Sequence, residues 1–174
     1  MKYMETGRFD QHPLMRLTLA LTLLFLLGLW LTNFGMYFSR MGLTADSVIH
    51  YYLGSLQTVG TDVTLLPPRS FESLLETTHA HLPIIGIVIL FLTHLIIFAP
   101  FGNGTKVALI TTAFLSALLN EGAGWLVRFV DPRFAYLKIG SFLLFQAAMS
   151  FMLITLAIFL WEAQKRSRAG GLDW

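Results

Sequence analysis

The chain has 174 residues, of which 55% are hydrophobic and 13% are charged. A soluble domain usually carries roughly 25% charged residues, so this chain cannot cover itself with a surface suited to water. It contains no cysteine, which excludes disulfides, thiolate metal ligands and cysteine nucleophiles, and its formal charge of +2 is not gathered into a nucleic-acid-binding arm. We therefore expect one transmembrane domain, residues 1–174, whose surroundings are lipid bilayer and not nucleic acid.

Residues 14–37 form the first apolar run of the chain. The apolar core of a secretory signal peptide has roughly 7 to 15 residues, so this run is too long to be one. It is long enough to cross the roughly 30 Å hydrocarbon core of a bilayer as an α-helix. We interpret it as the first membrane span.

Residues 38–81 form the one long connection, and loops of more than about 12 to 15 residues are usually structured or functional. A short helix is predicted over 46–56. Ser70 can cap a second helix that begins at Phe71 and continues into the next span. Tyr51, Tyr52, Phe71, Leu74 and Leu75 would let this region lie on the outer membrane interface, where amphipathic rings are favoured.

The second span, residues 82–101, carries histidines at two depths. His79 and His81 stand at its entry, and side chains two positions apart on a helix point about 200° apart, so at most one of them can face the bundle axis. His94 lies deeper. Imidazole is a common ligand of both haem and metals, so each histidine is a candidate ligand. The alternative is that the entry histidines bind water and headgroups, and that His94 bonds a carbonyl or a threonine.

The third span, residues 106–130, contains Glu121. At 1.5 Å per residue, Glu121 lies about 22 Å from Lys106, close to the depth of the entry histidines on the antiparallel neighbour. A carboxylate there could bind a metal, orient an imidazole or accept a proton, and an internal bond to Arg128 is the alternative. The candidate metal ligands at this level are His50, His79, His81 and Glu121.

The fourth span covers residues 139–161. Short joints rich in helix breakers, at 100–104 and 131–132, require antiparallel neighbours. The predicted fold is therefore all-α: an integral membrane four-helix up-and-down bundle with a long, partly helical outer loop between the first two helices.

Basic residues are more frequent on the cytoplasmic side of a membrane protein. With the N-terminus inside, the inner face carries Lys2, Arg8, Arg16, Lys106, Lys165, Arg166 and Arg168, and the outer face carries Arg40, Arg69, Arg128, Arg133 and Lys138. This bias favours an orientation in which both termini of the multi-pass protein lie in the cytoplasm.

Histidines at two depths of one helix resemble the arrangement in diheme b-type cytochromes, which hold one haem near each membrane face. The resemblance implies haem b, with His79 or His81 as the outer ligand and His94 as the inner ligand. Those proteins take the opposite ligands from a second helix, whereas the other three spans here contain no histidine. The opposite ligand would have to be His50, another residue type or a residue of a second copy of the chain.

Three further segments resemble a group of four-span bacterial membrane proteins encoded among redox genes. They are Tyr51-Tyr52-Leu53-Gly54, Thr78-His79-Ala80-His81-Leu82 and Trp125-Leu126-Val127-Arg128. The similarity implies a redox setting in the bacterial inner membrane, and it names no reaction.

The leading hypothesis is a small membrane haem- or metal-binding electron-transfer subunit of a redox complex. The alternative is a cofactor-free accessory or scaffold subunit, and the third hypothesis is a proton or metal transporter that uses His94 and Glu121. A homo-oligomer or other membrane redox subunits are the expected partners. The chain contains no nucleophile elbow and no His-Glu-x-x-His motif, so a hydrolase is disfavoured, and whether the chain is an enzyme by itself stays open.

Overall fold

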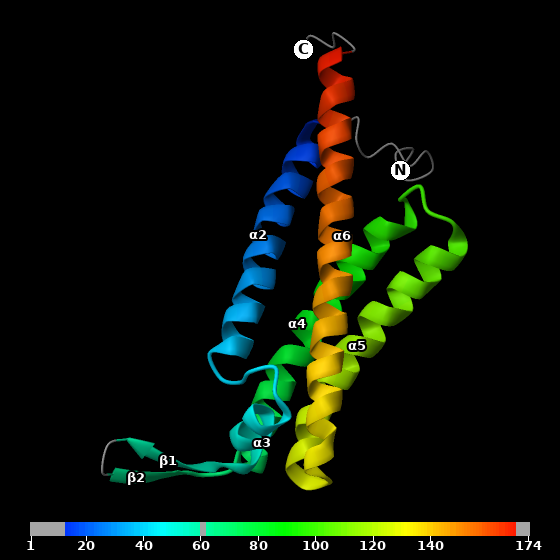
Figure 1. Cartoon of the computed structure of the whole chain (residues 1–174). Coiled ribbons are helices and arrows are strands. Elements are labelled where there is room, and N and C mark those ends of the chain that lie inside the picture. The colour runs from blue at the N-terminus through cyan, green and yellow to red at the C-terminus, as the bar shows by residue number, and fades with distance from the viewer. Residues whose placement is uncertain (1–12, 60–61, 170–174) are drawn as a thin grey trace.

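Four long apolar helices pack as an up-and-down bundle (Figure 1). The computed structural model of the chain describes residues 13–59 and 62–169. The four helices are α2 (Pro13–Phe38), α4 (Phe71–Ile97), α5 (Asn103–Phe129) and α6 (Ala135–Ala169). Each is long and apolar enough to cross a membrane. The predicted all-α four-helix fold is confirmed, and the chain is a multi-pass membrane protein.

The long connection between α2 and α4 contains a short helix and a β-hairpin. Helix α3 (Ala45–Leu53) is capped by Thr44, whose side chain accepts a hydrogen bond from the amide of Ser47. Strands β1 (Ser55–Val59) and β2 (Asp62–Leu66) pair antiparallel, with Leu56 opposite Leu65, and they project away from the bundle (Figure 1). The short helix was predicted, but the hairpin was not.

Local capping signals explain where α4 and α6 begin. The hydroxyl of Ser70 accepts a hydrogen bond from the amide of Ser73 at 3.1 Å, as predicted for a helix that starts at Phe71. The side chain of Asp131 accepts one from the amide of Arg133 at 2.7 Å, which starts the 3-10 turn η2 (Pro132–Phe134) that leads into α6. Helix α4 therefore carries the entry histidines within its own length.

Helix α6 is the centre of the bundle. It packs against α2, α4 and α5, and its contact with α5 is the most extensive. The buried face of α5 consists largely of small residues, which allow the two backbones to approach closely where lipid supplies no hydrophobic driving force. These residues are Ala113, Ser116, Ala117, Ala123 and Gly124.

Buried side chains form two separate clusters. The first, which we call the membrane cluster, includes Ile89, Leu92 and Met152 and lies between the four long helices. The second, the α3 cluster, gathers where α3 packs against the end of the bundle and includes Tyr37, Val48, Tyr52, Leu74 and Phe142. In it the rings of Tyr37 and Phe142 stack with their centroids 3.7 Å apart.

The position of Tyr52 corrects the sequence interpretation. Its side chain is only 6% exposed and belongs to the α3 cluster, as does that of Leu74, so these two side chains pack inside the protein and are not presented to a membrane surface. Burial raises the pKa of the Tyr52 hydroxyl, which stays neutral at physiological pH. Two of the basic residues used to predict the orientation, Lys2 and Arg8, lie outside the described residues.

Candidate functional site

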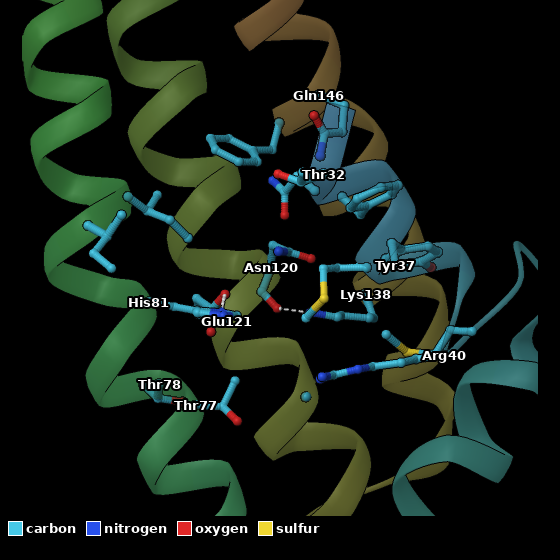
Figure 2. Close-up of a pocket in the computed structure, with 18 of the residues that line it drawn as sticks. Thr32, Tyr37, Arg40, Thr77, Thr78, His81, Asn120, Glu121, Lys138 and Gln146 are labelled. Carbon is cyan, nitrogen blue, oxygen red and sulfur yellow. Dashed lines mark hydrogen bonds and ion pairs between the residues drawn. The ribbon is translucent and has the colours of Figure 1, made fainter. Parts of the chain in front are cut away.

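A cavity of about 280 Å³ lies between α2, α4, α5 and α6 (Figure 2). Its walls include members of both core clusters: Phe145 and Met149 from the membrane cluster, and Tyr37 and Phe142 from the α3 cluster. Most of the wall is apolar and aromatic. Polar and charged side chains also line it, and these are Thr32, Asn33, Arg40, Thr77, Thr78, His81, Asn120, Glu121, Lys138 and Gln146.

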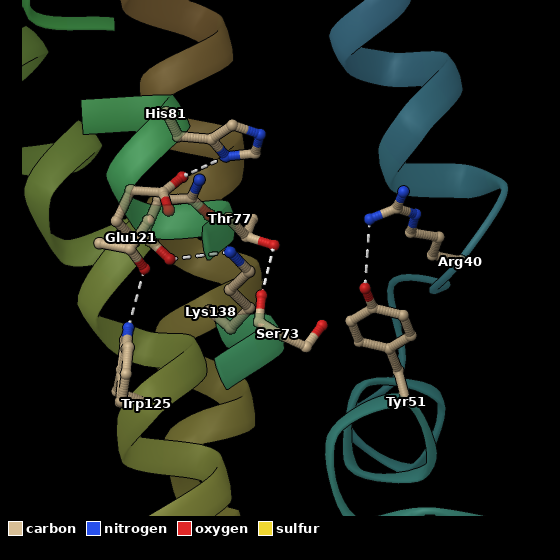
Figure 3. Close-up of polar contacts among 10 residues, drawn as sticks. Arg40, Tyr51, Ser73, Thr77, His81, Glu121, Trp125 and Lys138 are labelled. Carbon is tan, nitrogen blue, oxygen red and sulfur yellow. Dashed lines mark hydrogen bonds and ion pairs between the residues drawn. The ribbon is translucent and has the colours of Figure 1, made fainter. Parts of the chain in front are cut away.

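His81 on α4 and Glu121 on α5 contact each other at one side of this cavity. Their Nδ1 and Oε1 atoms are 3.2 Å apart (Figure 3). The His81 side chain is 44% exposed and the Glu121 side chain is 12% exposed. The pair therefore joins a nearly buried carboxylate to an imidazole nearer the surface. Such a pair can accept and release protons.

Lys138 is a buried cation in the same wall. Its side chain comes from α6 and is only 7% exposed. Removing a charge from water costs roughly several kcal/mol unless a partner compensates it. The ammonium group donates a hydrogen bond to the backbone carbonyl of Asn120 at 2.8 Å (Figure 2). Asn120 directly precedes Glu121 in the chain.

Two amide side chains that line the cavity have buried atoms without a partner. Both Nε2 and Oε1 of Gln146 lack one, as does Oδ1 of Asn120. Gln146 is only 3% exposed. Buried polar atoms in native proteins are nearly always hydrogen-bonded to protein, water or a ligand. These two wall residues therefore carry a donor and acceptors that are buried and unused in this structure.

Side-chain contacts hold the α3 end of the site in place. The indole of Trp125 donates to the hydroxyl of Thr78 at 2.9 Å, which ties α5 to α4. Figure 3 labels Trp125 and draws this contact as a dashed line from its indole nitrogen. The guanidinium of Arg40, just after α2, donates to the hydroxyl of Tyr51 on α3 at 3.3 Å. These contacts fix the side chains of Trp125 and Tyr51, which both line the cavity.

The predicted ligand residues take different places. His81 and Glu121 meet in the cavity wall, whereas His50 and His79 are exposed and do not line it. His94 is also exposed, and its ring meets the edge of Phe98 with centroids 5.5 Å apart. Within residues 13–59 and 62–169, no group of three His, Cys, Asp or Glu side chains is placed to hold a metal ion.

The alternative prediction, a bond between Glu121 and Arg128, is wrong. Glu121 bonds His81. Arg128 instead donates to the backbone carbonyl of Arg69 at 2.9 Å.

Sequence reasoning missed Lys138 and Gln146. The fourth span was predicted to start after Lys138, and this residue was counted with the outer surface, whereas it is buried within α6. Lys138, Phe142 and Gln146 follow one another at steps of four residues, so they lie on one helix face. Two polar residues on one face of an apolar helix were the signal that could have found them.

Comparison with known proteins gives a family and no closer relative. A family model described as a transmembrane helical domain matches residues 42–167, which include α3, the hairpin, α4, α5 and most of α6. No curated protein and no solved structure matches the chain. The matched region is more than half of the sequence, and the chain belongs to the Aq_1264_TM family of transmembrane helical domains.

Proposed function

We propose that this protein binds a quinone in the interhelical cavity and serves as a small electron-transfer subunit of a membrane redox complex. The observation that carries the proposal is the unpaired, buried amide of Gln146 in the wall of a largely apolar cavity. The cavity volume of about 280 Å³ lies just below the roughly 300 to 1,000 Å³ range of small-molecule sites. That space suits a single substituted ring.

The chemistry of the wall favours a quinone head over a purely apolar ligand. A quinone is a planar ring with two carbonyl acceptors, and its reduced form carries two hydroxyl donors. The side-chain amide of Gln146 can donate and accept, and Oδ1 of Asn120 can accept, so these groups can serve both redox forms. The rings of Trp30 and Phe145 in the wall offer faces and edges to a planar ligand.

The His81–Glu121 pair supplies the proton chemistry that such a ligand needs. Reduction of a quinone to a quinol takes up two electrons and two protons, and oxidation releases them. The imidazole and the carboxylate are side chains that exchange protons readily, and both line the cavity. The electrons would pass to or from a one-electron carrier in a partner subunit, in keeping with the redox setting that the sequence resemblance implies.

The positions of the histidines do not favour haem or a bound metal at this site. A bis-histidine haem needs two imidazoles that converge from opposite sides. His79 and His94 are exposed and do not line the cavity, and His81 is engaged with Glu121. The predicted ligands therefore do not converge on one site in the described part of the chain.

Tryptophan fluorescence tests quinone binding directly. Two of the four tryptophans, Trp30 and Trp125, line the cavity, so replacing Trp161 and Trp174 with phenylalanine leaves two reporters at the site. We expect a decyl benzoquinone to quench this variant saturably in nanodiscs. Quenching that rises linearly with quinone, as for random collisions in the bilayer, would contradict the proposal and favour a cofactor-free scaffold.

The substitution Gln146→Leu tests the group that carries the proposal. Removing the amide should weaken quinone binding by about tenfold, because hydrogen bonds worth roughly 0.5 to 1.5 kcal/mol each are lost. Gln164→Leu places the same change on an exposed position of α6 and should leave binding unchanged. Equal affinities in the two variants would remove Gln146 from the site.

A further inference from the structure

We infer that the cavity opens sideways into the bilayer between α2 and α4, so that its ligand is a membrane-dissolved molecule with a hydrocarbon tail. This inference rests on the proposed quinone site and adds the route of entry. The route determines which chemical class can reach the polar groups. A water-soluble ligand would instead need an opening at an end of the bundle.

The exposure of the wall residues locates the opening. Every wall residue on α6 is buried, as is Gly124 on α5. The exposed residues of the wall lie on only two elements of the bundle. They are Leu29, Thr32 and Met36 on α2, Arg40 just after it, and Ile84 on α4. The floor of the cavity is therefore formed by α5 and α6, and its mouth lies between α2 and α4.

The packing of α2 leaves this mouth open. Helix α2 packs chiefly on α6, and α4 packs chiefly on α5, whereas α2 and α4 make little contact with each other. Helix α2 is also the least buried of the four spans. Figure 2 shows the two helices on opposite sides of the cavity, with His81 toward α4 and with Tyr37 and Arg40 toward α2.

The side chains at the mouth match a lipid-soluble ligand. Leu29, Met36 and Ile84 are apolar and exposed at positions within the membrane spans. The apolar part of this rim is compatible with acyl chains, and the exposed Thr32 and Arg40 add polar groups beside it. A quinone head can thus reach Lys138 and Gln146 at the floor while its tail remains between the two helices.

A thiol block at the mouth tests the route, and the chain is suited to it because it contains no cysteine. We compare Ile84→Cys with Ile87→Cys, each labelled with a bulky, non-fluorescent maleimide in the two-tryptophan background. Both residues are exposed on α4, but only Ile84 lines the cavity. The label at position 84 should slow association of decyl benzoquinone by about tenfold or more, and the label at position 87 should leave the rate unchanged.

The outcomes separate the route from the proposed function. If the unlabelled protein fails to bind quinone, the proposed function is wrong. If it binds, and the label at position 84 leaves the association rate equal to that of the position 87 control, entry between α2 and α4 is wrong.

Tail length gives a second, independent test of the opening. The cavity of about 280 Å³ cannot enclose a long isoprenoid chain together with a ring. We expect a quinone with a long isoprenoid tail to bind at least as tightly as the tailless ring, since the tail stays in the mouth and in lipid. Loss of binding with increasing tail length would show a closed cavity.

Discussion

Gly124 lies in the wall of the cavity against the ring of Tyr52. A Cβ atom at position 124 would come within 2.7 Å of the Tyr52 hydroxyl oxygen and 2.9 Å of its Cζ atom. Tyr52 is buried in the α3 cluster and cannot move away without disturbing its neighbours. The absence of a side chain at this position is therefore what allows α3 to pack against α5.

The substitution Gly124→Ala should destabilise the protein. Overpacking of a buried contact typically costs about 1 to 3 kcal/mol, so the thermal melting temperature in detergent should fall. Gly122→Ala on the same helix is the control, because a Cβ at position 122 meets no atom within 4 Å. It should leave the melting temperature unchanged or raise it slightly, since alanine favours helix. A Gly124→Ala variant that melts with the parent would contradict the close packing of α3 on α5.

At the scale of elements, the cap of α4 has a measurable effect. Ser70 satisfies the amide of Ser73 at the first turn of this helix. Ser70→Ala should cost about 1 kcal/mol and speed amide hydrogen exchange over the first turn, whereas Ser70→Asp should retain stability because aspartate also caps well. Equal exchange in the alanine and aspartate variants would mean that the cap does not hold the start of α4.

Helices were easier to predict from this sequence than the hairpin. Long apolar runs and caps such as Ser70 are local signals, and the helices that they predict are present. The segment 55–66 also carried a local signal, since β-branched residues flank Gly60, but the interpretation of the connection as partly helical left no place for strands.

The candidate site was predictable only in part. Counting residues along antiparallel helices placed Glu121 at the depth of the entry histidines, and its contact with His81 agrees with that level. Gln146 could not be assigned to the same site, because whether its side chain faces Glu121 depends on how α6 is rotated and tilted against α5. Those angles follow from packing between helices and not from the apolar pattern of either one.

At the scale of the whole molecule, the cavity is lined by members of both buried clusters. The membrane cluster holds the four long helices together, and the α3 cluster closes one end. Between them the walls carry the polar groups of the candidate site and do not fill the space. The proposed ligand site therefore lies where residues of the two clusters come together.

Photolabelling tests the central claim most directly. The protein in nanodiscs is irradiated with an azido benzoquinone that carries an alkyl tail, with excess unlabelled decyl benzoquinone as competitor, and the labelled peptides are mapped. We predict competable labelling on the cavity faces of α2 and α6, between Leu29 and Tyr37 and between Lys138 and Met149. Labelling that the competitor does not reduce, or that falls on exposed positions away from the cavity such as Leu24 and Ile154, would contradict binding in the cavity.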